Sequence, residues 1–364
     1  MASTFLCRWD TSALPVNAFA SALSSPPSWL ADLREAAKNK ALCFGTSIKQ
    51  EIAIADPSYV EAALLASECL ASEAEFHWQF MSPRRGVRDF RRSDWFVELA
   101  LSHGIEFRGG NLIWHHRLPT WFPFLSPSAA HSEMVAQLTA VVSRFRTRVE
   151  SWDVVNEALE PEHGAPGGFR RSLLFEKLGP GFVATAFEAA AAAHPAALLT
   201  YNDYGFEYET RRSLAKRRAL LALLADLKSQ GVPVSALGIQ SHLRGEERAF
   251  GEREFRSFLA EVASMGLKIL VTELDVRDDR LGSSIQQRDQ LVADAYERYL
   301  NVVLDERAVV GVTVWGLSDR HSWLSYAYPR KDGLPVRTLP LDSRLMPKKA
   351  WFAILRALNS APHR

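Results

Sequence analysis

Two glutamates that end or interrupt apolar stretches are the residues of this sequence best suited to chemistry. Glu157 ends the stretch SWDVVNE (151–157), and Glu273 lies within KILVTELDV (268–276). A strand has little local use for a carboxylate near its C-terminal end, where α/β barrels place their reactive groups. Two carboxylates on different strands suit hydrolysis of a glycosidic bond, because one protonates the leaving oxygen while the other attacks the anomeric carbon.

Three neighbouring residues could support this pair. Asn156, beside Glu157, can donate a hydrogen bond to a sugar hydroxyl. Asp275 lies two residues after Glu273, so both side chains point to the same face of a strand. His242, from the stretch ALGIQSHL, could be held by Asp275 and donate in turn to Glu273. That contact would keep Glu273 ionised as a nucleophile.

Polar or aromatic residues recur at the C-terminal ends of seven of the eight stretches that we predict to be strands. Taken singly, each is more simply a capping or surface residue. Their recurrence at one end of successive strands favours a shared site, in which the aromatic rings offer flat apolar faces for sugar rings. The substrate-binding candidates of this kind are Glu73, His77, Trp78, Trp114, His115, Tyr204, Gln240, Trp315 and Trp323.

Apolar stretches alternate with helical ones along the chain, which predicts a parallel sheet. Eight such units fit an α/β fold of the closed (β/α)8 TIM barrel type, and no G-x-G-x-x-G follows the first strand to favour an open nucleotide-binding sheet. The expected strands cover residues 41–48, 73–78, 105–114, 151–157, 197–204, 236–243, 268–276 and 309–319. The expected helices cover residues 29–40, 57–72, 93–103, 134–149, 181–193, 211–230, 252–265, 286–304 and 347–358.

The predicted organisation is an N-terminal arm followed by one catalytic domain. The arm covers residues 1–28, which are rich in Ser, Pro and Ala, and the domain covers residues 29–364. The segment 318–345, after the eighth strand, is predicted to be a loop. Loops of that length are usually functional.

Composition excludes several classes of protein. The chain has 364 residues, of which 47% are hydrophobic, and a formal net charge of +1, so neither nucleic acid nor an anionic membrane is an expected partner. Three cysteines without C-x-x-C spacing argue against a disulfide framework or a zinc site, and we expect no metal and no cofactor. The first thirty residues lack a basic segment followed by a continuous apolar one, so the expected location is the cytoplasm unless a processed form hides a signal. The oligomeric state stays open.

Five segments in order, WDVVNEAL, NDY, GIQSHL, VTELDV and VTVWGLSDRHSW, resemble glycoside hydrolase family 10, the β-1,4-xylanases and related β-glycanases. LIWHHRLPTW and CFGTSI resemble two further family segments, so the likeness covers about residues 41–357. The resemblance implies a TIM barrel and retaining hydrolysis of a β-linked oligo- or polysaccharide. It implies Glu157 as general acid/base and Glu273 as nucleophile, with supporting roles for Asn156, His242, Asp275 and most of the substrate-binding candidates. The retaining mechanism predicts the two carboxyl groups to lie about 5–5.5 Å apart.

The sequence departs from this family where the sugar on one side of the cleaved bond would bind. The family pattern E-N-x-x-K-W is EAEFHW here, so Ala74 and His77 replace an Asn and a Lys. Gly110 replaces the His of GHT, and Arg117, a further substrate-binding candidate, stands where the family has Gln. We expect Ala74 and Gly110 to open space for a sugar with a C6 group or a branch. A carboxylate on an acidic polysaccharide could meet Arg117 together with Arg84, Arg85 and Arg88, which otherwise form a solvated basic face.

Three other functions fit parts of the pattern. A β-glycosidase of the same fold could act on a non-xylan or acidic oligosaccharide. A non-catalytic carbohydrate-binding barrel is disfavoured because both glutamates and His242 are present. A metal-dependent barrel hydrolase would use His115, His116, His242 and Asp275, but adjacent histidines on a strand point to opposite faces and could not share one metal.

Overall fold

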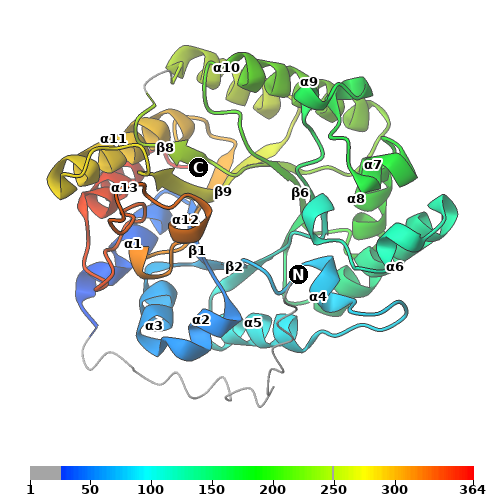
Figure 1. Ribbon diagram of the computed structural model, residues 1–364, viewed down its shortest axis with the longest axis horizontal. Coiled ribbons are helices and arrows are strands. Elements are labelled where there is room, and N and C mark those ends of the chain that lie inside the picture. Colours follow the sequence, from blue (N-terminus) through cyan, green and yellow to red (C-terminus); the bar gives the residue numbers. More distant parts are fainter. Residues whose placement is uncertain (1–25, 248–249) are drawn as a thin grey trace.

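The computed structural model describes residues 26–247 and 250–364, and in it eight parallel strands close into a barrel surrounded by helices (Figure 1). Each strand pairs with the next in the chain, and the last pairs with the first, so the barrel has no open edge. The barrel strands are β1 (Cys43–Ile48), β2 (Cys69–Ser72), β3 (Glu106–Gly109), β5 (Ser151–Asn156), β6 (Leu198–Asp203), β7 (Ala236–Ile239), β9 (Lys268–Arg277) and β10 (Val309–Val314). The predicted (β/α)8 TIM barrel is confirmed.

Two short strands extend the barrel wall above the main strands. The strand β4 (Ile113–Trp114) pairs with the end of β5, and β8 (His242–Arg244) pairs with the end of β9. Both therefore lie at the C-terminal end of the barrel, which is the end where TIM barrels carry their sites.

The helices begin where the sequence supplies capping groups. The side chains of Ser126, Thr210 and Ser284 accept hydrogen bonds from the first turns of α6, α9 and α11, and Pro127 stands at the first position of α6. The outer helices are α1 (Asp32–Lys38), α3 (Pro57–Ala66), α5 (Arg91–Ser102), α6 (Pro127–Phe145), α8 (Phe182–Ala193), α9 (Arg211–Ser229), α10 (Glu252–Ser264), α11 (Ile285–Val303) and α13 (Lys349–Ser360). Short helices are α2 (Gln50–Ala55), α4 (Trp78–Met81), α7 (Leu173–Leu178) and α12 (Leu324–Ala327).

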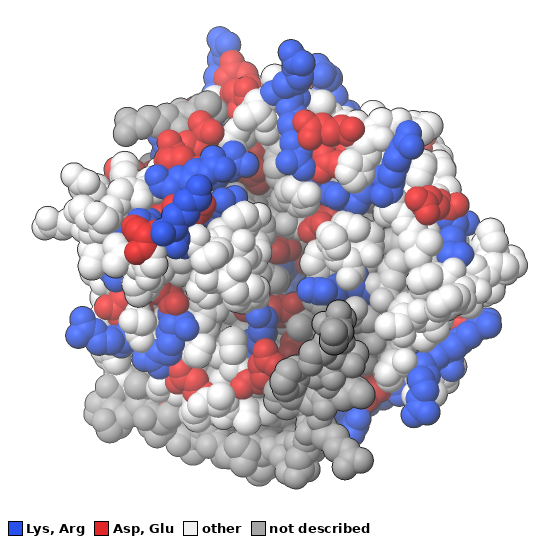
Figure 2. Space-filling view, viewed as in Figure 1, with Lys and Arg blue, Asp and Glu red and all other residues white. Residues whose placement is uncertain are grey.

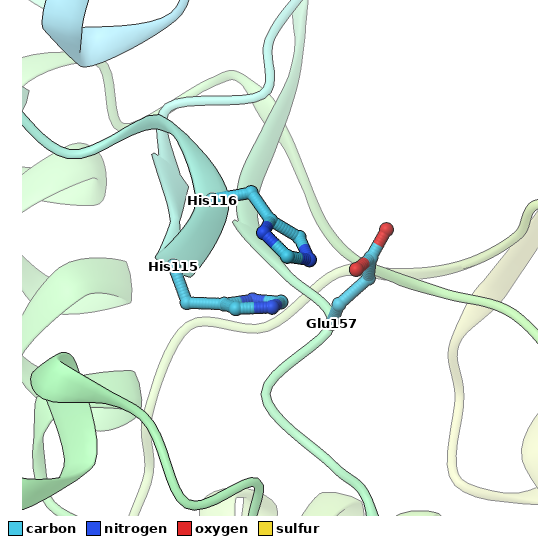
Figure 3. A group of neighbouring side chains, drawn as sticks. All are labelled: His115, His116 and Glu157. Atoms are coloured by element: carbon cyan, nitrogen blue, oxygen red, sulfur yellow. The ribbon is translucent and has the colours of Figure 1, made fainter. Parts of the chain in front are cut away.

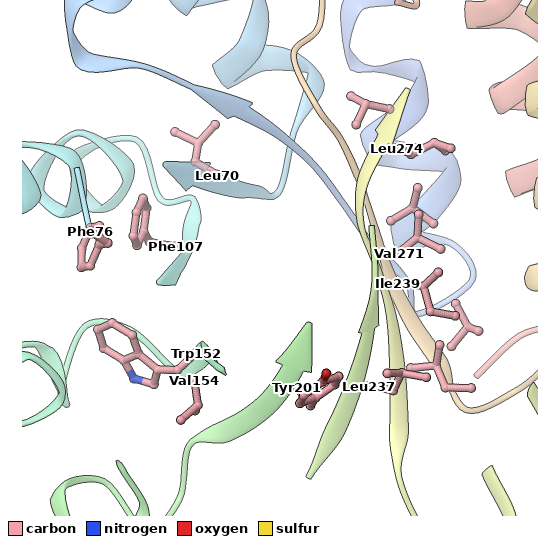
Figure 4. Packing of buried hydrophobic residues seen from close by; sticks show 14 of the residues in the cluster. Leu70, Phe76, Phe107, Trp152, Val154, Tyr201, Leu237, Ile239, Val271 and Leu274 are labelled. Atoms are coloured by element: carbon pink, nitrogen blue, oxygen red, sulfur yellow. The ribbon is translucent and has the colours of Figure 1, made fainter. Parts of the chain in front are cut away.

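The core lies between the strands and the helices that cover them. Figure 4 shows part of it, where apolar side chains of neighbouring strands stack at successive levels. Phe76 and Phe107 contact at 5.1 Å between ring centroids, and Trp152 lies 5.9 Å from Phe76. Burial of such rings holds the strand ends in fixed positions. No helix in the described part of the chain is long and apolar enough to cross a membrane.

The prediction for residues 57–78 is wrong in its boundaries. The helix α3 ends at Ala66, and the second strand is Cys69–Ser72, while Glu73 to His77 form the loop that follows it. The strand has only four residues and carries no Gly or Pro before it, so its apolar run continues the helical pattern without a visible break. The correction moves Glu73 and His77 from the strand to the loop at its C-terminal end.

Two other expectations need correction. The stretch 105–114 is two strands, β3 and β4, interrupted at Gly110, whose φ is 146°. The segment 236–243 is likewise divided into β7 and the start of β8, with Ser241 in a left-handed conformation between them. Of the predicted arm 1–28, residues 1–25 lie outside the described residues. Residues 26–28 lead into the 3-10 turn Ser28–Ala31 that precedes α1.

Candidate active site

A cleft of about 660 Å³ lies at the C-terminal end of the barrel. Figure 2 shows it as the hollow in the middle of this face, with acidic side chains inside it. Twelve of the predicted site residues line it, namely Glu73, His77, Trp114, Arg117, Asn156, Glu157, Tyr204, Gln240, His242, Glu273, Trp315 and Trp323. They come from the ends of most barrel strands, as the recurrence of polar residues predicted.

The backbone turns at Glu157 to aim its side chain into the cleft. Glu157 directly follows β5 and has a φ of 56°, in the left-handed region that non-glycine residues seldom occupy. Its backbone N–H donates to the carbonyl of Asn202 on β6 at 2.9 Å, which holds the turn. Strained backbone of this kind is found at functional sites, where the surrounding structure enforces it.

The Glu157 carboxyl group is buried and favours its protonated form. Burial raises its pKa above the ordinary value of 4.5, and the charge of Asp203 raises it further. Gln240 Nε2 donates to Glu157 Oε1 at 3.0 Å and Asn156 Nδ2 donates to the same oxygen at 3.2 Å. Of these contacts, the Gln240 bond lowers the pKa, because a donor stabilises the ionised carboxylate.

The Glu273 carboxylate lies among hydrogen-bond donors. Asn202 Nδ2 donates to Glu273 Oε1 at 2.8 Å, and His242 Nε2 lies 3.3 Å from Glu273 Oε2. On its other side, His242 Nδ1 contacts Asp275 Oδ1 at 3.0 Å, the contact that strand periodicity predicted. Trp323 Nε1 donates to the second Asp275 oxygen at 2.6 Å.

His242 is held in its charged form. Burial lowers its pKa, but the carboxylates of Asp275 and Glu273 together raise the pKa well above the ordinary value of 6.5. An imidazolium between two carboxylates can donate to both, so His242 can direct one N–H at Glu273 and the other at Asp275. Asp275 is fully buried and does not line the cleft, so it acts through His242.

Asn202 joins the two halves of the site, although it is not among the site residues predicted from the sequence. Its Nδ2 also donates to Asn156 Oδ1 at 2.9 Å, and its Oδ1 accepts from Thr272 Oγ1 at 2.7 Å. It therefore connects β5, β6 and β9 beneath both glutamates. The signal in the sequence was its place in NDY, at the end of a predicted strand.

Lys49 is a second residue that the sequence patterns missed. Its Nζ lies 3.2 Å from Glu73 Oε2, and it donates to Tyr326 Oη at 3.3 Å. His77, where the family has Lys, is buried, and burial lowers its pKa to about 3, so it is neutral. Lys49, directly after β1, thus supplies a cation on this side of the cleft.

His115 and His116 do not point to opposite faces, so that expectation is wrong. They lie in a 3-10 turn, His115–Arg117, where successive side chains are rotated by about 120°. Their ring centroids are 4.0 Å apart, and Figure 3 shows both rings facing Glu157. Donor atoms of these three residues all lie within 4.8 Å of one another, so they could hold a metal ion, which would occupy the Glu157 carboxylate.

Several predicted contacts fall outside the cleft. Trp78 is only 1% exposed and packs against Trp121 and Phe122, so it is a core residue and its assignment to substrate binding is wrong. His115 lies behind the cleft lining, beside Glu157. Arg84, Arg85 and Arg88, in the loop after the second strand, also do not line the cleft. Arg85 is paired with Glu133, and Arg88 donates to Ser82.

Gly110 does not open space in the cleft, contrary to the prediction. A Cβ atom added at Gly110 would lie 2.7 Å from the Cβ of Asp153, and the φ of 146° favours glycine. Ala74, in contrast, does line the cleft. Of these two positions, Ala74 is therefore the one that lines the cleft.

Restoring the family's histidine is therefore expected to damage the fold. For Gly110→His we expect the free energy of unfolding to fall by at least about 1–3 kcal/mol from backbone strain, with a further loss from the contact with Asp153. Urea unfolding measures it. Gly164→Ala is the matched control, because Gly164 also has a positive φ but no atom within 4 Å of its added Cβ. An equal loss in both variants would contradict the packing argument.

Comparison with known proteins agrees with this geometry. Residues 32–357 match the model of the family described as Glycosyl hydrolase family 10. Endo-1,4-beta-xylanase A of Fusarium oxysporum f. sp. lycopersici is 33% identical over 80% of this chain and 87% of its own length. Xylanase 10B of Thermotoga maritima superposes with a TM-score of 0.81 at 29% identity, over 90% of this chain and 97% of that one. The xylobiose complex of xylanase 10B from Thermotoga petrophila RKU-1 gives the same TM-score and identity, over 90% and 96% of the two chains.

The family match spans nearly the whole barrel, including both glutamates and the loop that carries Trp323. The three similar proteins described above are named as xylanases, and the similarity covers most of their length. The alternatives of a non-catalytic barrel and of a metal-dependent hydrolase are not favoured. The chain belongs to glycosyl hydrolase family 10 and is a retaining glycoside hydrolase of the endo-1,4-β-xylanase-like type.

Proposed function

We propose that the chain cleaves β-1,4-linked xylan-type glycans with Glu157 as general acid/base and Glu273 as nucleophile. The observation that carries the assignment is the contrast between two carboxyl groups in one cleft. Burial raises the pKa of Glu157, whereas Glu273 accepts hydrogen bonds from Asn202 and a charged His242. A carboxyl group whose pKa is raised suits the general acid, and a carboxylate that accepts hydrogen bonds from two side chains suits the nucleophile.

The reaction would proceed in two displacements. Glu273 Oε attacks the anomeric carbon while Glu157 transfers its proton to the leaving glycosidic oxygen, and a covalent glycosyl-enzyme forms. Glu157, now ionised, removes a proton from water, which attacks the same carbon and releases Glu273. The second inversion restores the original β configuration.

The cleft walls supply sugar contacts. Trp114, Trp315 and Trp323 line the cleft and are partly exposed, so their rings can stack on sugar faces. Glu73 with Lys49 and Tyr204 with Arg170 place polar atoms on opposite walls, where hydroxyl groups need partners. Loss of one such buried bond costs about 1–3 kcal/mol, so these residues set the preference for one sugar over another.

Turnover of aryl β-xylobioside and aryl β-cellobioside, with proton NMR of the first product, tests the proposal. We expect faster cleavage of the xylobioside and a product that is initially the β-anomer. Absence of turnover on both substrates and on xylan would contradict the function. An α-anomer as first product would contradict the roles of the two glutamates.

The pH profile gives a separate prediction. Activity needs Glu157 protonated, so activity is lost as pH rises through its pKa, and burial moves that loss above the range of an exposed glutamate. For Gln240→Met we expect the alkaline limb of kcat/KM to move to higher pH, because a donor to the ionised carboxylate is lost. The acid limb should stay in place as the internal control. A shift to lower pH would contradict the assignment.

A further inference from the structure

Two arginines lie side by side on one wall of the cleft. In the ladder between β8 and β9, Arg244 is opposite Arg277, two positions beyond the pair of His242 and Asp275. Because side chains alternate along a strand, Arg244 points to the same face as His242. Both arginines line the cleft together with His242.

An aromatic ring lies under each guanidinium group. Arg277 lies over the ring of Tyr328 at 3.4 Å from the centroid, and Arg244 lies over Tyr208 at 6.0 Å. Both tyrosines line the cleft. Stacking on a ring restricts the plane of a guanidinium without using its N–H groups, which point outward from the edge of that plane.

The protein compensates only part of this charge. Arg277 Nε and Nη2 each lie 3.0 Å from an oxygen of Asp279. In residues 26–247 and 250–364, no hydrogen bond or ion pair joins the exposed Arg244 guanidinium to a carboxylate. Like charges at opposite positions of neighbouring strands repel each other, and an anion between them would relieve that repulsion.

The other cations that line the cleft either have a carboxylate partner or lie on a different part of its wall. Lys49 is paired with Glu73, and Arg212 is paired with Glu160 at 2.5 Å. Arg117 lies over Trp114, on a different part of the wall. Arg244 and Arg277 thus place two adjacent guanidinium groups on the cleft wall, and among the described residues Arg277 alone of the two has a carboxylate partner.

We propose that Arg244 and Arg277 bind a carboxylate carried by the glycan, such as a uronic acid substituent, so that acidic β-glycans are preferred to neutral ones. This inference rests on the proposed function and names the substrate class of the same cleft. Two residues of a strand span roughly 6–7 Å, so the pair lies beyond the reacting centre along the wall. The carboxylate would therefore belong to a sugar next to the one that meets Glu273.

The test compares two forms of one ligand. The first is a xylo-oligosaccharide that bears a glucuronic acid substituent, and the second is the same molecule after reduction of its carboxyl group to an alcohol. For the unmodified enzyme we expect kcat/KM to be roughly tenfold higher for the acidic form at low salt. The ratio of kcat/KM for the acidic form to kcat/KM for the reduced form should fall toward one in Arg244→Gln. In the unmodified enzyme the same ratio should decrease as salt is added.

Arg218→Gln is the matched control, because Arg218 is an exposed arginine on α9 that does not line the cleft. It should leave the ratio unchanged. Equal or lower kcat/KM for the acidic form, or a ratio that Arg244→Gln does not alter, would overturn the inference.

Calorimetric binding of both forms to the inactive variant Glu273→Gln separates this inference from the proposed function. If neither form is hydrolysed by the unmodified enzyme, the proposed function fails. Tighter binding of the acidic form, lost in Glu273→Gln combined with Arg244→Gln, would still support the carboxylate site. Equal binding of the two forms would refute it.

Discussion

Replacing Glu273 with alanine is expected to lower kcat on every β-glycan substrate by on the order of 10⁴–10⁶-fold, the loss seen when a covalent nucleophile is removed. Without the carboxylate, no glycosyl-enzyme forms, and the remaining groups only bind and protonate the substrate. The measurement is turnover of an aryl β-xylobioside and of xylan. Binding of the substrate should persist, because Asn202 and His242 stay in place around the vacated carboxylate.

Glu261→Ala is the matched control, since Glu261 is an exposed glutamate on α10 outside the cleft. Its kcat should equal that of the unmodified enzyme. Residual activity of Glu273→Ala above about one part in a thousand, once contaminating enzyme is excluded, would show that another group serves as nucleophile.

Replacing Glu157 with alanine is expected to lower the rate of glycosidic bond cleavage by a factor that depends on the leaving group. A glycosidic oxygen of xylan needs a proton to leave, so kcat should fall by about 10²–10⁴-fold, the usual contribution of general acid catalysis. A dinitrophenolate leaves without a proton, so formation of the glycosyl-enzyme from a dinitrophenyl glycoside should be slowed far less. Its hydrolysis should then be limited by the second step, which lacks a base.

Azide distinguishes this role from a structural one. It needs no general base and fits the space that Glu157→Ala leaves, so we expect it to restore turnover of the dinitrophenyl glycoside and to give a β-glycosyl azide. Glu162→Ala, an exposed glutamate five residues away, should show neither leaving-group dependence nor azide rescue. Equal losses of kcat/KM, which reports formation of the glycosyl-enzyme, on xylan and on the dinitrophenyl glycoside would contradict the assignment of Glu157.

The barrel and its reactive end could be predicted because both follow from local pattern. Long amphipathic helices such as Arg211–Ser229 and Ile285–Val303 have clear caps and periodicity. The spacing of Glu273 and Asp275 placed both on one strand face, and the His242 contact followed from that. The family motifs then assigned the two glutamates.

Other features could not be predicted from the sequence, because they depend on backbone geometry or on contacts across the barrel. The four-residue strand Cys69–Ser72 carries too little pattern to separate it from the helix before it. The 3-10 turn at His115 directs two adjacent rings to the same side, which alternation along a strand does not predict. The replacement of a histidine by Gly110 suggested added space, but the backbone at Gly110, with its positive φ, lies close to Asp153. The Arg244–Arg277 pair required the register between β8 and β9.

The central claim is that Glu273 forms the covalent intermediate, and mass spectrometry of a trapped enzyme tests it most directly. A 2,4-dinitrophenyl 2-deoxy-2-fluoro-β-xylobioside forms the intermediate but slows its hydrolysis, because fluorine destabilises the positive charge that develops at the anomeric carbon. We expect one added glycosyl group per chain, located at Glu273 within the peptide VTELDV. Label on Glu157 or on another residue, or no label while the substrate is hydrolysed with inversion, would contradict the mechanism.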